Sequence, residues 1–213
     1  MVVSWYTQCL IGGYLKGKDL LSISDLSADE IRSLIIGAAD MKAKNNWLTT
    51  LGGNVLALIF EKPSLRTRVS FEVAMRQLGG QVVSLSPAEV GLGQRESVAD
   101  VARVLSRYAD VIAARTFSHR TLEIMADHSD VPVINALSDM EHPCQALADL
   151  LTISENKGGL DGLTLAFIGD GNNVAYSLLL AAALTGVDFR IASPAGYTIQ
   201  ERLLSLARDY ARE

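Results

Sequence analysis

The sequence predicts an α/β fold made of two doubly wound parallel-sheet domains, the second of which is incomplete in this chain. Short apolar runs, typical of strands buried on both faces, alternate along the chain with segments of helical apolar periodicity. Polar and cationic residues follow several of these runs, and ligands of open parallel sheets bind at the carboxyl ends of the strands. An apolar fraction of 49% over 213 residues is ample for one large domain or two small ones.

The first part of the chain contains four predicted strands. The helix before them is expected to begin at Ser27, where Glu30 completes a capping box. The strands are predicted at residues 55–60, 81–85, 111–115 and 131–135, and the helices between and after them at 65–78, 96–109, 122–128 and 144–154. This alternation predicts a first domain over residues 1–150, with a polar, glycine-containing segment just past its last helix.

Residues 151–213 are predicted to begin a second domain. Strands are expected at 163–168 and 189–193, with an apolar helical run at 174–187 between them. A last helical stripe is formed by Ile199, Leu203, Leu206, Ala207 and Tyr210. These elements amount to about half of a doubly wound domain, so we expect a partial chain.

The segment at residues 60–80 carries the strongest signal for a binding site. Ser64 stands at a helix N-cap position, and the first turn adds Arg66, Thr67 and Arg68. Backbone N–H groups, hydroxyls and guanidinium groups can therefore converge on one small anion. Further along this helix Leu65, Val69 and Val73 repeat at helical spacing, with Phe71, Met75 and Leu78 beside them. An ordinary helix start with surface arginines is the alternative.

Two more polar positions are predicted at the same edge of the sheet. Arg115 ends the third strand, and His142 precedes a proline suited to the first position of a helix. The imidazole of His142 is therefore expected to lie over the strand ends, where neutral His142 or Gln145 can donate a hydrogen bond to a carbonyl oxygen. A capping role, or a histidine satisfied in the core, is the alternative for His142.

Four stretches resemble the signatures of one family, the aspartate and ornithine carbamoyltransferases. FEKPSLRTRVSFE resembles the carbamoyl-phosphate signature S-T-R-T-R, with Leu65 where most relatives have Thr. HPCQALADLLT resembles the second signature, HPxQxLxDxxT, at every fixed position. ARTFSHRTLE resembles the stretch that supplies a further ligand, here Arg115. GDGNN resembles the turn of the ornithine enzymes whose second Asn, here Asn173, contacts the amino-acid substrate.

The resemblance implies transfer of the carbamoyl group from carbamoyl phosphate to the δ-amine of L-ornithine, giving citrulline and phosphate, in arginine biosynthesis or the reverse catabolic direction. Residues 1–150 would be the carbamoyl-phosphate-binding domain and residues 151–213 the start of the ornithine-binding domain. The implied catalytic residues are Arg66, Thr67, Arg115 and His142, and carbamoyl phosphate would be bound by Ser64, Leu65, Arg66, Thr67, Arg115, His142 and Gln145. Asn173 is the implied ornithine ligand, and neither a metal nor a cofactor is implied.

The family resemblance also implies assembly into homotrimers or multiples of trimers, in which a neighbour's loop reaches into each site. Many ornithine enzymes carry Gln in that loop, and Gly91 is expected at its place. Aspartate carbamoyltransferases use a lysine there, and residues 86–94 contain none. An aspartate, putrescine or acylated-ornithine acceptor, or a non-catalytic carbamoyl-phosphate-binding fragment, is the alternative. Most acceptor ligands of the family would lie beyond residue 213, so this chain alone is expected to be incomplete for catalysis.

Composition excludes several other classes. A net charge of −5 argues against a general nucleic-acid binder. No apolar run is long enough to span a bilayer, and residues 1–18 lack a signal-peptide pattern. Cys9 and Cys144 suggest no disulfide framework, so the cytoplasm is the simplest location. The turn at 169–173 lacks the third glycine of a dinucleotide fingerprint, so NAD binding is not expected.

Overall fold

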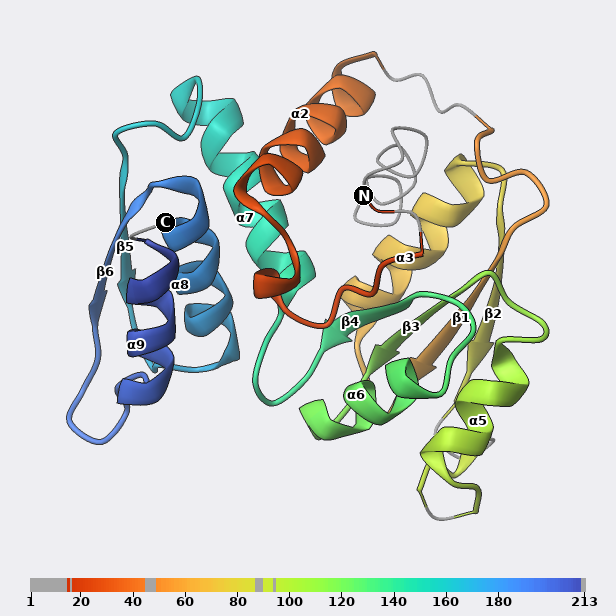
Figure 1. Cartoon of the computed structure of the whole chain (residues 1–213). Helices are drawn as coiled ribbons and strands as arrows, with labels where there is room; N and C mark the ends of the chain where they lie inside the picture. Colours follow the sequence, from red (N-terminus) through yellow and green to blue (C-terminus); the bar gives the residue numbers. More distant parts are fainter. Residues whose placement is uncertain (1–14, 16, 45–48, 87–89, 94, 212–213) are drawn as a thin grey trace.

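Two parallel β-sheets with flanking helices form the structure, which confirms the predicted α/β class (Figure 1). The computed structural model describes residues 15, 17–44, 49–86, 90–93 and 95–211. Its strands are β1 (Val55–Phe60), β2 (Gln81–Leu85), β3 (Val111–Arg115), β4 (Val133–Leu137), β5 (Thr164–Ile168) and β6 (Asp188–Ala192). Its helices are η1 (Ile23–Asp25), α2 (Ala28–Lys44), α3 (Leu65–Gln77), α5 (Val98–Leu105), α6 (His119–Asp127), α7 (Pro143–Lys157), α8 (Asn173–Thr185) and α9 (Glu201–Tyr210).

The first sheet has the strand order β2-β1-β3-β4 and is covered on both faces. Alternate residues of β1 enter two separate cores, because successive side chains of a strand point to opposite faces. Leu56 and Leu58 pack in the cluster that includes residues of α2, α3 and α7, whereas Ala57 and Ile59 pack with residues of α5 and α6. The pairing brings Phe60 level with Arg115, so the turn after β1 meets the end of β3.

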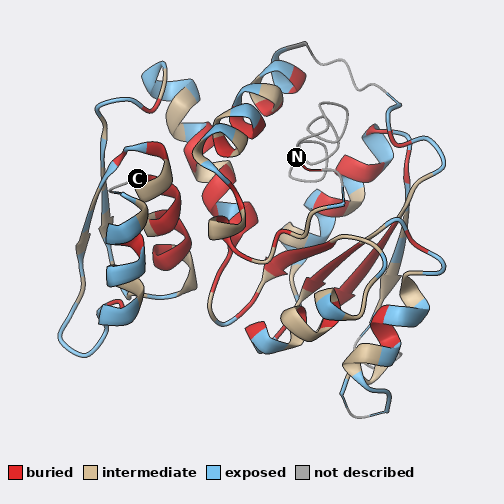
Figure 2. Cartoon of the chain, viewed as in Figure 1, coloured by how far each residue is buried: buried red, intermediate tan, exposed pale blue. Residues whose placement is uncertain are grey.

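In the described part of the chain, the second sheet consists of β5 and β6 and lies beside α8 and α9 (Figure 1). One face, with Phe167 and Phe189, packs against the core cluster. The residues of the other face are exposed (Figure 2). Ile168, on that face, is 86% exposed. Helix α7 follows β4, contacts both α2 and α8, and thereby connects the two sheets. The predicted boundary between residues 150 and 151 falls inside this helix.

The predicted bounds of β1, β2 and β3 are confirmed. The Ser27–Glu30 capping box also forms: Ser27 N donates to Glu30 Oε2 at 2.7 Å, and Glu30 N donates to Ser27 Oγ at 3.2 Å. The fourth strand begins two residues later than the apolar run predicts. Pro132 has no N–H to donate to a ladder, and the carbonyl oxygen of Val131 accepts from Ser129 Oγ at 2.6 Å. The strand therefore begins at Val133.

The apolar residues of α3 divide into a buried and an exposed stripe. Phe71, Met75 and Leu78 are buried, whereas Leu65 is 81% and Val69 is 47% exposed. Residues 71 and 73 lie about 200° apart around an α-helix, so only one of the two stripes can face the sheet. Leu206 of the last helix, expected in the buried stripe, is likewise 40% exposed.

Candidate active site

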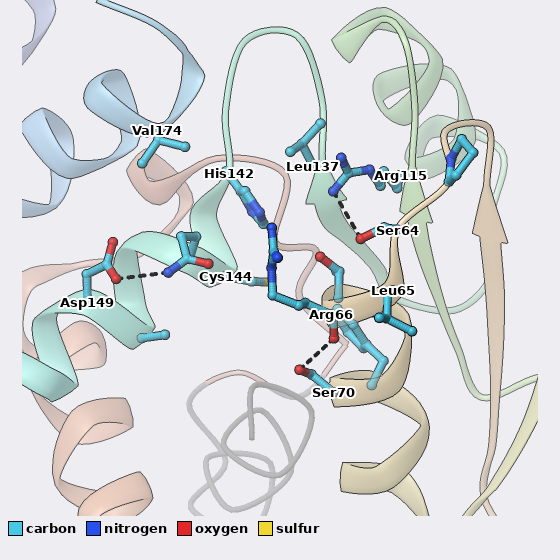
Figure 3. Close-up of a pocket in the computed structure, with 15 residues that line it drawn as sticks. Ser64, Leu65, Arg66, Ser70, Arg115, Leu137, His142, Cys144, Asp149 and Val174 are labelled. Carbon is cyan, nitrogen blue, oxygen red and sulfur yellow. Dashed lines mark hydrogen bonds between the residues drawn. The ribbon is translucent and has the colours of Figure 1, made fainter. Parts of the chain in front are cut away.

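A cavity of about 750 Å³ lies at the carboxyl ends of the first sheet, between α3 and the start of α7 (Figure 3). Seven of the residues singled out from the sequence line it: Ser64, Leu65, Arg66, Thr67, Arg115, His142 and Gln145. The sequence places them in three separate segments, and the parallel strands bring those segments to one edge. Val174 of α8 completes the wall, so both sheet regions contribute to the cavity.

The first turn of α3 provides donors on one side of the cavity. Ser64 is the N-cap residue, but its side chain does not accept from the first-turn amides. Those N–H groups and the positive end of the helix dipole are thus available to an anion. Figure 3 shows the side chain of Arg66 extending from this turn toward His142. Arg68, on the same turn, forms an ion pair with Glu72 at 2.8 Å and does not line the cavity.

Arg115 provides a second guanidinium group across the cavity. Its Nη1 lies 3.4 Å from Ser64 Oγ, while its Nε is buried without a hydrogen-bond partner. Burial lowers the pKa of Arg115, which still leaves an arginine charged at neutral pH. Among the described residues, neither Arg66 nor Arg115 forms an ion pair with an acidic side chain. An unpaired cation with a buried, unsatisfied donor is unusual unless a ligand completes it.

The loops after β1 and β3 are fastened to each other, which fixes Ser64 relative to Arg115. Glu61 N donates to the carbonyl oxygen of Arg115 at 2.8 Å, and Glu61 Oε2 accepts from Phe117 N at 2.7 Å. Lys62 Nζ lies 4.6 Å from the centroid of the Phe117 ring, a distance suited to a cation–π contact. The two loops therefore present their cavity residues as one unit.

His142 is the N-cap residue of α7, with Pro143 in the first turn, as the sequence predicted. The side chain is 9% exposed, and its Nδ1 is buried without a hydrogen-bond partner. Burial, together with the neighbouring charge of Arg115, lowers the pKa of His142 to about 4. The imidazole is therefore neutral at pH 7 and can donate a hydrogen bond without carrying charge.

Gln145 and Asp149 line the far wall of the cavity on successive turns of α7. Gln145 Nε2 donates to Asp149 Oδ1 at 2.9 Å, which orients the amide and leaves its oxygen directed away from that bond. Burial raises the pKa of Asp149, and the bond from Gln145 lowers it in part. Among the described residues that line the cavity, Asp149 is thus the one acidic side chain.

Asn173 does not line this cavity. Its Nδ2 donates to the carbonyl oxygen of Ser138 at 2.7 Å, and its Oδ1 accepts from Val174 N at 3.0 Å. It borders a second cavity of about 380 Å³, between the starts of α6 and α9. The ornithine contact assigned to Asn173 stays a prediction.

The sequence patterns did not indicate a role for several residues of the site. Leu137 lies at the end of β4, and Asp149 is a fixed position of the second signature, so strand position and motif could have indicated both.

Gly91 has a φ of 54°, and a Cβ there would lie 2.7 Å from Arg95 Cβ, so a larger residue is disfavoured at this position. Parts of the surrounding loop, residues 87–89 and 94, lie outside the described residues, as does Cys9.

No helix in the described ranges is long and apolar enough to cross a bilayer. In that same part of the chain, no three His, Cys, Asp or Glu side chains are grouped as metal ligands would be. The free Cys144 is buried, and burial raises the pKa of its thiol to about 12. A thiol in this environment is not a nucleophile at neutral pH.

The fold and the cavity define a class of α/β protein in which a cationic cavity lies at the carboxyl edge of a parallel sheet, next to the start of a second sheet. The chain belongs to the aspartate/ornithine carbamoyltransferase family: residues 18–155 match its carbamoyl-P binding domain and residues 161–213 its Asp/Orn binding domain.

Proteins named ornithine carbamoyltransferase are among its relatives. The one from Anoxybacillus flavithermus is 52% identical over 202 residues, which cover 93% of this chain and 64% of that protein. The one from Bacillus subtilis is 52% identical over 197 residues, covering 92% of this chain and 61% of that protein. The solved ornithine carbamoyltransferase from Pyrococcus furiosus has a TM-score of 0.89 and 45% identity, covering 93% of this chain and 64% of that one. The chain therefore spans somewhat less than two thirds of these relatives.

Proposed function

We propose that this chain carries the carbamoyl-phosphate half of a site that transfers a carbamoyl group to the δ-amine of L-ornithine, giving L-citrulline and phosphate. The observation that carries the proposal is the cavity in which Arg66 and Arg115, both without an acidic partner among the described residues, face neutral His142. Residues 1–150 would form the carbamoyl-phosphate-binding domain and residues 151–213 the start of the ornithine-binding domain.

The phosphate group would lie against the first turn of α3. The backbone amides of that turn, the hydroxyls of Ser64 and Thr67, and the guanidinium groups of Arg66 and Arg115 supply donors for its oxygens. Leu65 would contribute its backbone N–H alone, because its side chain has no donor. Charge-assisted bonds of this kind neutralise the leaving phosphate, which lowers the barrier to breaking the bond between the carbonyl carbon and the phosphate oxygen.

The carbamoyl group would lie between Arg115 and α7. Negative charge builds on its carbonyl oxygen when the amine attacks, and Thr67, Arg115 and His142 can donate to that oxygen. Gln145, held by Asp149, would accept from the carbamoyl nitrogen through its amide oxygen. The rate enhancement would come from positioning and electrostatic stabilisation, with no covalent intermediate.

The acceptor is the less constrained half of the proposal. The names of the relatives and the GDGNN turn favour ornithine, whereas the matched family description includes both aspartate and ornithine. Assembly into homotrimers, a cytoplasmic location and a role in arginine biosynthesis or its reversal stay predictions that rest on the family resemblance.

The proposal is tested by calorimetric titration of this chain with carbamoyl phosphate. We expect saturable binding, and Arg66→Ala should weaken it by about 2–4 kcal/mol, because a charge-assisted contact is lost in a site where no other side chain replaces it. Arg68→Ala is the matched control, since it removes the same charge from the same helical turn but its guanidinium pairs with Glu72.

Absence of carbamoyl-phosphate binding by the unaltered chain would refute the proposal. Equal weakening by Arg66→Ala and Arg68→Ala would show that the titration reports net charge rather than a site.

A further inference from the structure

The carboxylate of Glu141 is buried where the two sheet regions meet, one residue before His142. Glu141 is 0% exposed. Its Oε1 accepts from Ser22 Oγ at 2.5 Å, and its Oε2 accepts from Ile23 N at 3.1 Å and from Ser177 Oγ at 3.0 Å. Ser22 and Ile23 begin η1, and Ser177 lies in α8. One side chain therefore joins the segment before the first sheet to the helix of the second.

Ser177 extends this link to the backbone of His142. Its hydroxyl is fully buried, donates to Glu141 and accepts from the backbone N–H of His142 at 2.9 Å. One turn earlier in α8, Asn173 donates to the carbonyl oxygen of Ser138 at 2.7 Å. The start of α8 is thus attached at two points to the loop between β4 and α7, the loop that ends in His142.

We propose that Glu141 is a positioning residue for carbamoyl transfer: through Ser177, its carboxylate fixes the backbone of His142 against the first turns of α8. The carbamoyl-phosphate side of the site and the acceptor side would then keep one relative placement. The inference rests on the proposed function, which gives His142 and Asn173 their roles. Glu141 does not line the cavity, so it acts through His142 and not on the substrate.

Because Glu141 can gain or lose a proton, its effect on His142 can be distinguished from that of an uncharged packed side chain. Asp25 of η1 and Tyr176 of α8 are the charged or titratable groups that interact with it electrostatically, and His119 of α6 bonds Ser138 of the same loop, with 2.9 Å between His119 Nδ1 and Ser138 Oγ. Burial raises the pKa of Glu141 to about 7 and that of Tyr176 to about 12.

The two histidines near the loop respond in the opposite direction. Burial lowers the pKa of His119 and lowers that of His142 to about 4. Of these three groups, Glu141 is the one whose pKa is raised, and it is raised to about 7. A protonated carboxyl accepts fewer hydrogen bonds, and Ser22 Oγ has Ser24 Oγ as another partner at 2.6 Å. Protonation should consequently shift the bonds that hold Ser177 and His142.

The test uses the three histidines of the chain as reporters. Their Cε1–H signals are followed by NMR from pH 5 to 8 without ligand, and the signal of His142 is assigned by its loss in His142→Gln. We expect the His142 signal to move with a midpoint near pH 7, although the ring itself titrates at much lower pH. Glu141→Gln should abolish this step, and Glu155→Gln, which removes a partly exposed carboxylate on α7, should leave it intact.

Two results would overturn the inference: a His142 signal with no step near neutral pH, or a step that persists unchanged in Glu141→Gln. Binding gives a second readout. Glu141→Ala is expected to raise the dissociation constant for carbamoyl phosphate about tenfold, an effect typical of residues that act without touching the ligand. Glu141→Gln should recover most of that loss because it retains hydrogen-bonding groups.

Unchanged affinity in Glu141→Ala would contradict a positioning role in the site. The two proposals fail separately. If the unaltered chain binds no carbamoyl phosphate while the pH step still requires Glu141, the proposed function fails and the coupling of Glu141 to His142 stands. If carbamoyl phosphate binds and the step is absent, the reverse holds.

Discussion

The two sheets of this molecule differ in how completely they are covered. In the first, β1, β3 and β4 are almost entirely buried, with helices on both faces; in the second, every other residue of β5 and β6 is exposed (Figure 2). The candidate ligands for carbamoyl phosphate all lie with the first sheet, whereas Asn173, the one assigned acceptor residue, lies with the second. The more fully buried sheet is therefore the one that carries the proposed ligands for carbamoyl phosphate.

The largest expected effect concerns turnover. We expect this chain to bind carbamoyl phosphate but to make no citrulline above a control without ornithine. An acceptor that is not held near the carbonyl carbon loses the proximity contribution, which reaches ~7–11 kcal/mol. Chromatographic detection of citrulline measures this. Turnover within the usual enzymatic range, about 1–1000 per second, would show that the second region already holds the acceptor.

Substitutions in the two sheets should differ in their effect on the free energy of unfolding. Leu58→Ala in β1 removes a side chain that is 0% exposed, and we expect a loss of about 2–5 kcal/mol in the free energy of unfolding. Ile168→Ala in β5 removes one that is 86% exposed, so a change within about 0.5 kcal/mol is expected. Urea unfolding measures both. A comparable loss for Ile168→Ala would mean that the outer face of β5 is covered in solution.

The junction between the sheets should make stability depend on pH. Burial raises the pKa of Glu141 from 4.5 to about 7, so the folded state binds the proton more tightly than the unfolded chain does. The tighter binding of this proton stabilises the folded state. That stabilisation is fully present below pH 4.5 and is lost as the pH rises through 7.

Relative to the unaltered chain, Glu141→Gln should therefore gain about 2–3 kcal/mol of stability between pH 5 and 8. The comparison requires urea unfolding of both proteins at each pH. Glu155→Gln provides the control, because its carboxylate is partly exposed and pairs with Lys42. A constant difference between the Glu141→Gln and unaltered proteins across this range would contradict the raised pKa.

The smallest effect is expected at Cys144. It lies beside His142 and lines the cavity, yet burial raises the pKa of its thiol to about 12. Cys144→Ala should leave the affinity for carbamoyl phosphate within about twofold and cost about 1 kcal/mol of stability, as typical for a small buried side chain. In a Cys9→Ser background, a thiol reagent should label Cys144 only when the chain unfolds. Rapid labelling of the folded protein would contradict the prediction that the buried Cys144 thiol is unreactive.

The sequence predicted correctly those elements whose bounds depend on residues close together in the chain. The bounds of β1, β2 and β3 and the capping of α2 follow from apolar runs and from side chains a few residues apart, and all were anticipated. The predicted start of β4 was wrong because Pro132 has no N–H and the carbonyl oxygen of Val131 bonds Ser129, so the strand begins two residues later than the apolar run suggests. On α3, periodicity alone could not decide which of two apolar stripes faces the sheet.

The parts of the site that depend on distant partners could not be predicted. The motifs identified the cavity residues, but the 3.4 Å approach of Arg115 to Ser64 depends on the pairing of β1 with β3. Glu141 reads as an ordinary polar residue beside His142. Its burial and its bonds to Ser22 and Ser177 become visible only when three segments of the chain are folded together.

Helix α7 begins at the cavity and ends where the chain turns into the second sheet. It runs unbroken from Pro143 to Lys157 and ends at Gly158 and Gly159, whose φ angles are 79° and 147°. Fifteen residues of α-helix make a strut about 22 Å long. A tilt of about 5° at its cavity end would displace its far end by about 2 Å. A rigid tilt of α7 about its cavity end would therefore move the start of the second sheet, and Gly158 and Gly159 form the turn that joins the helix to that sheet.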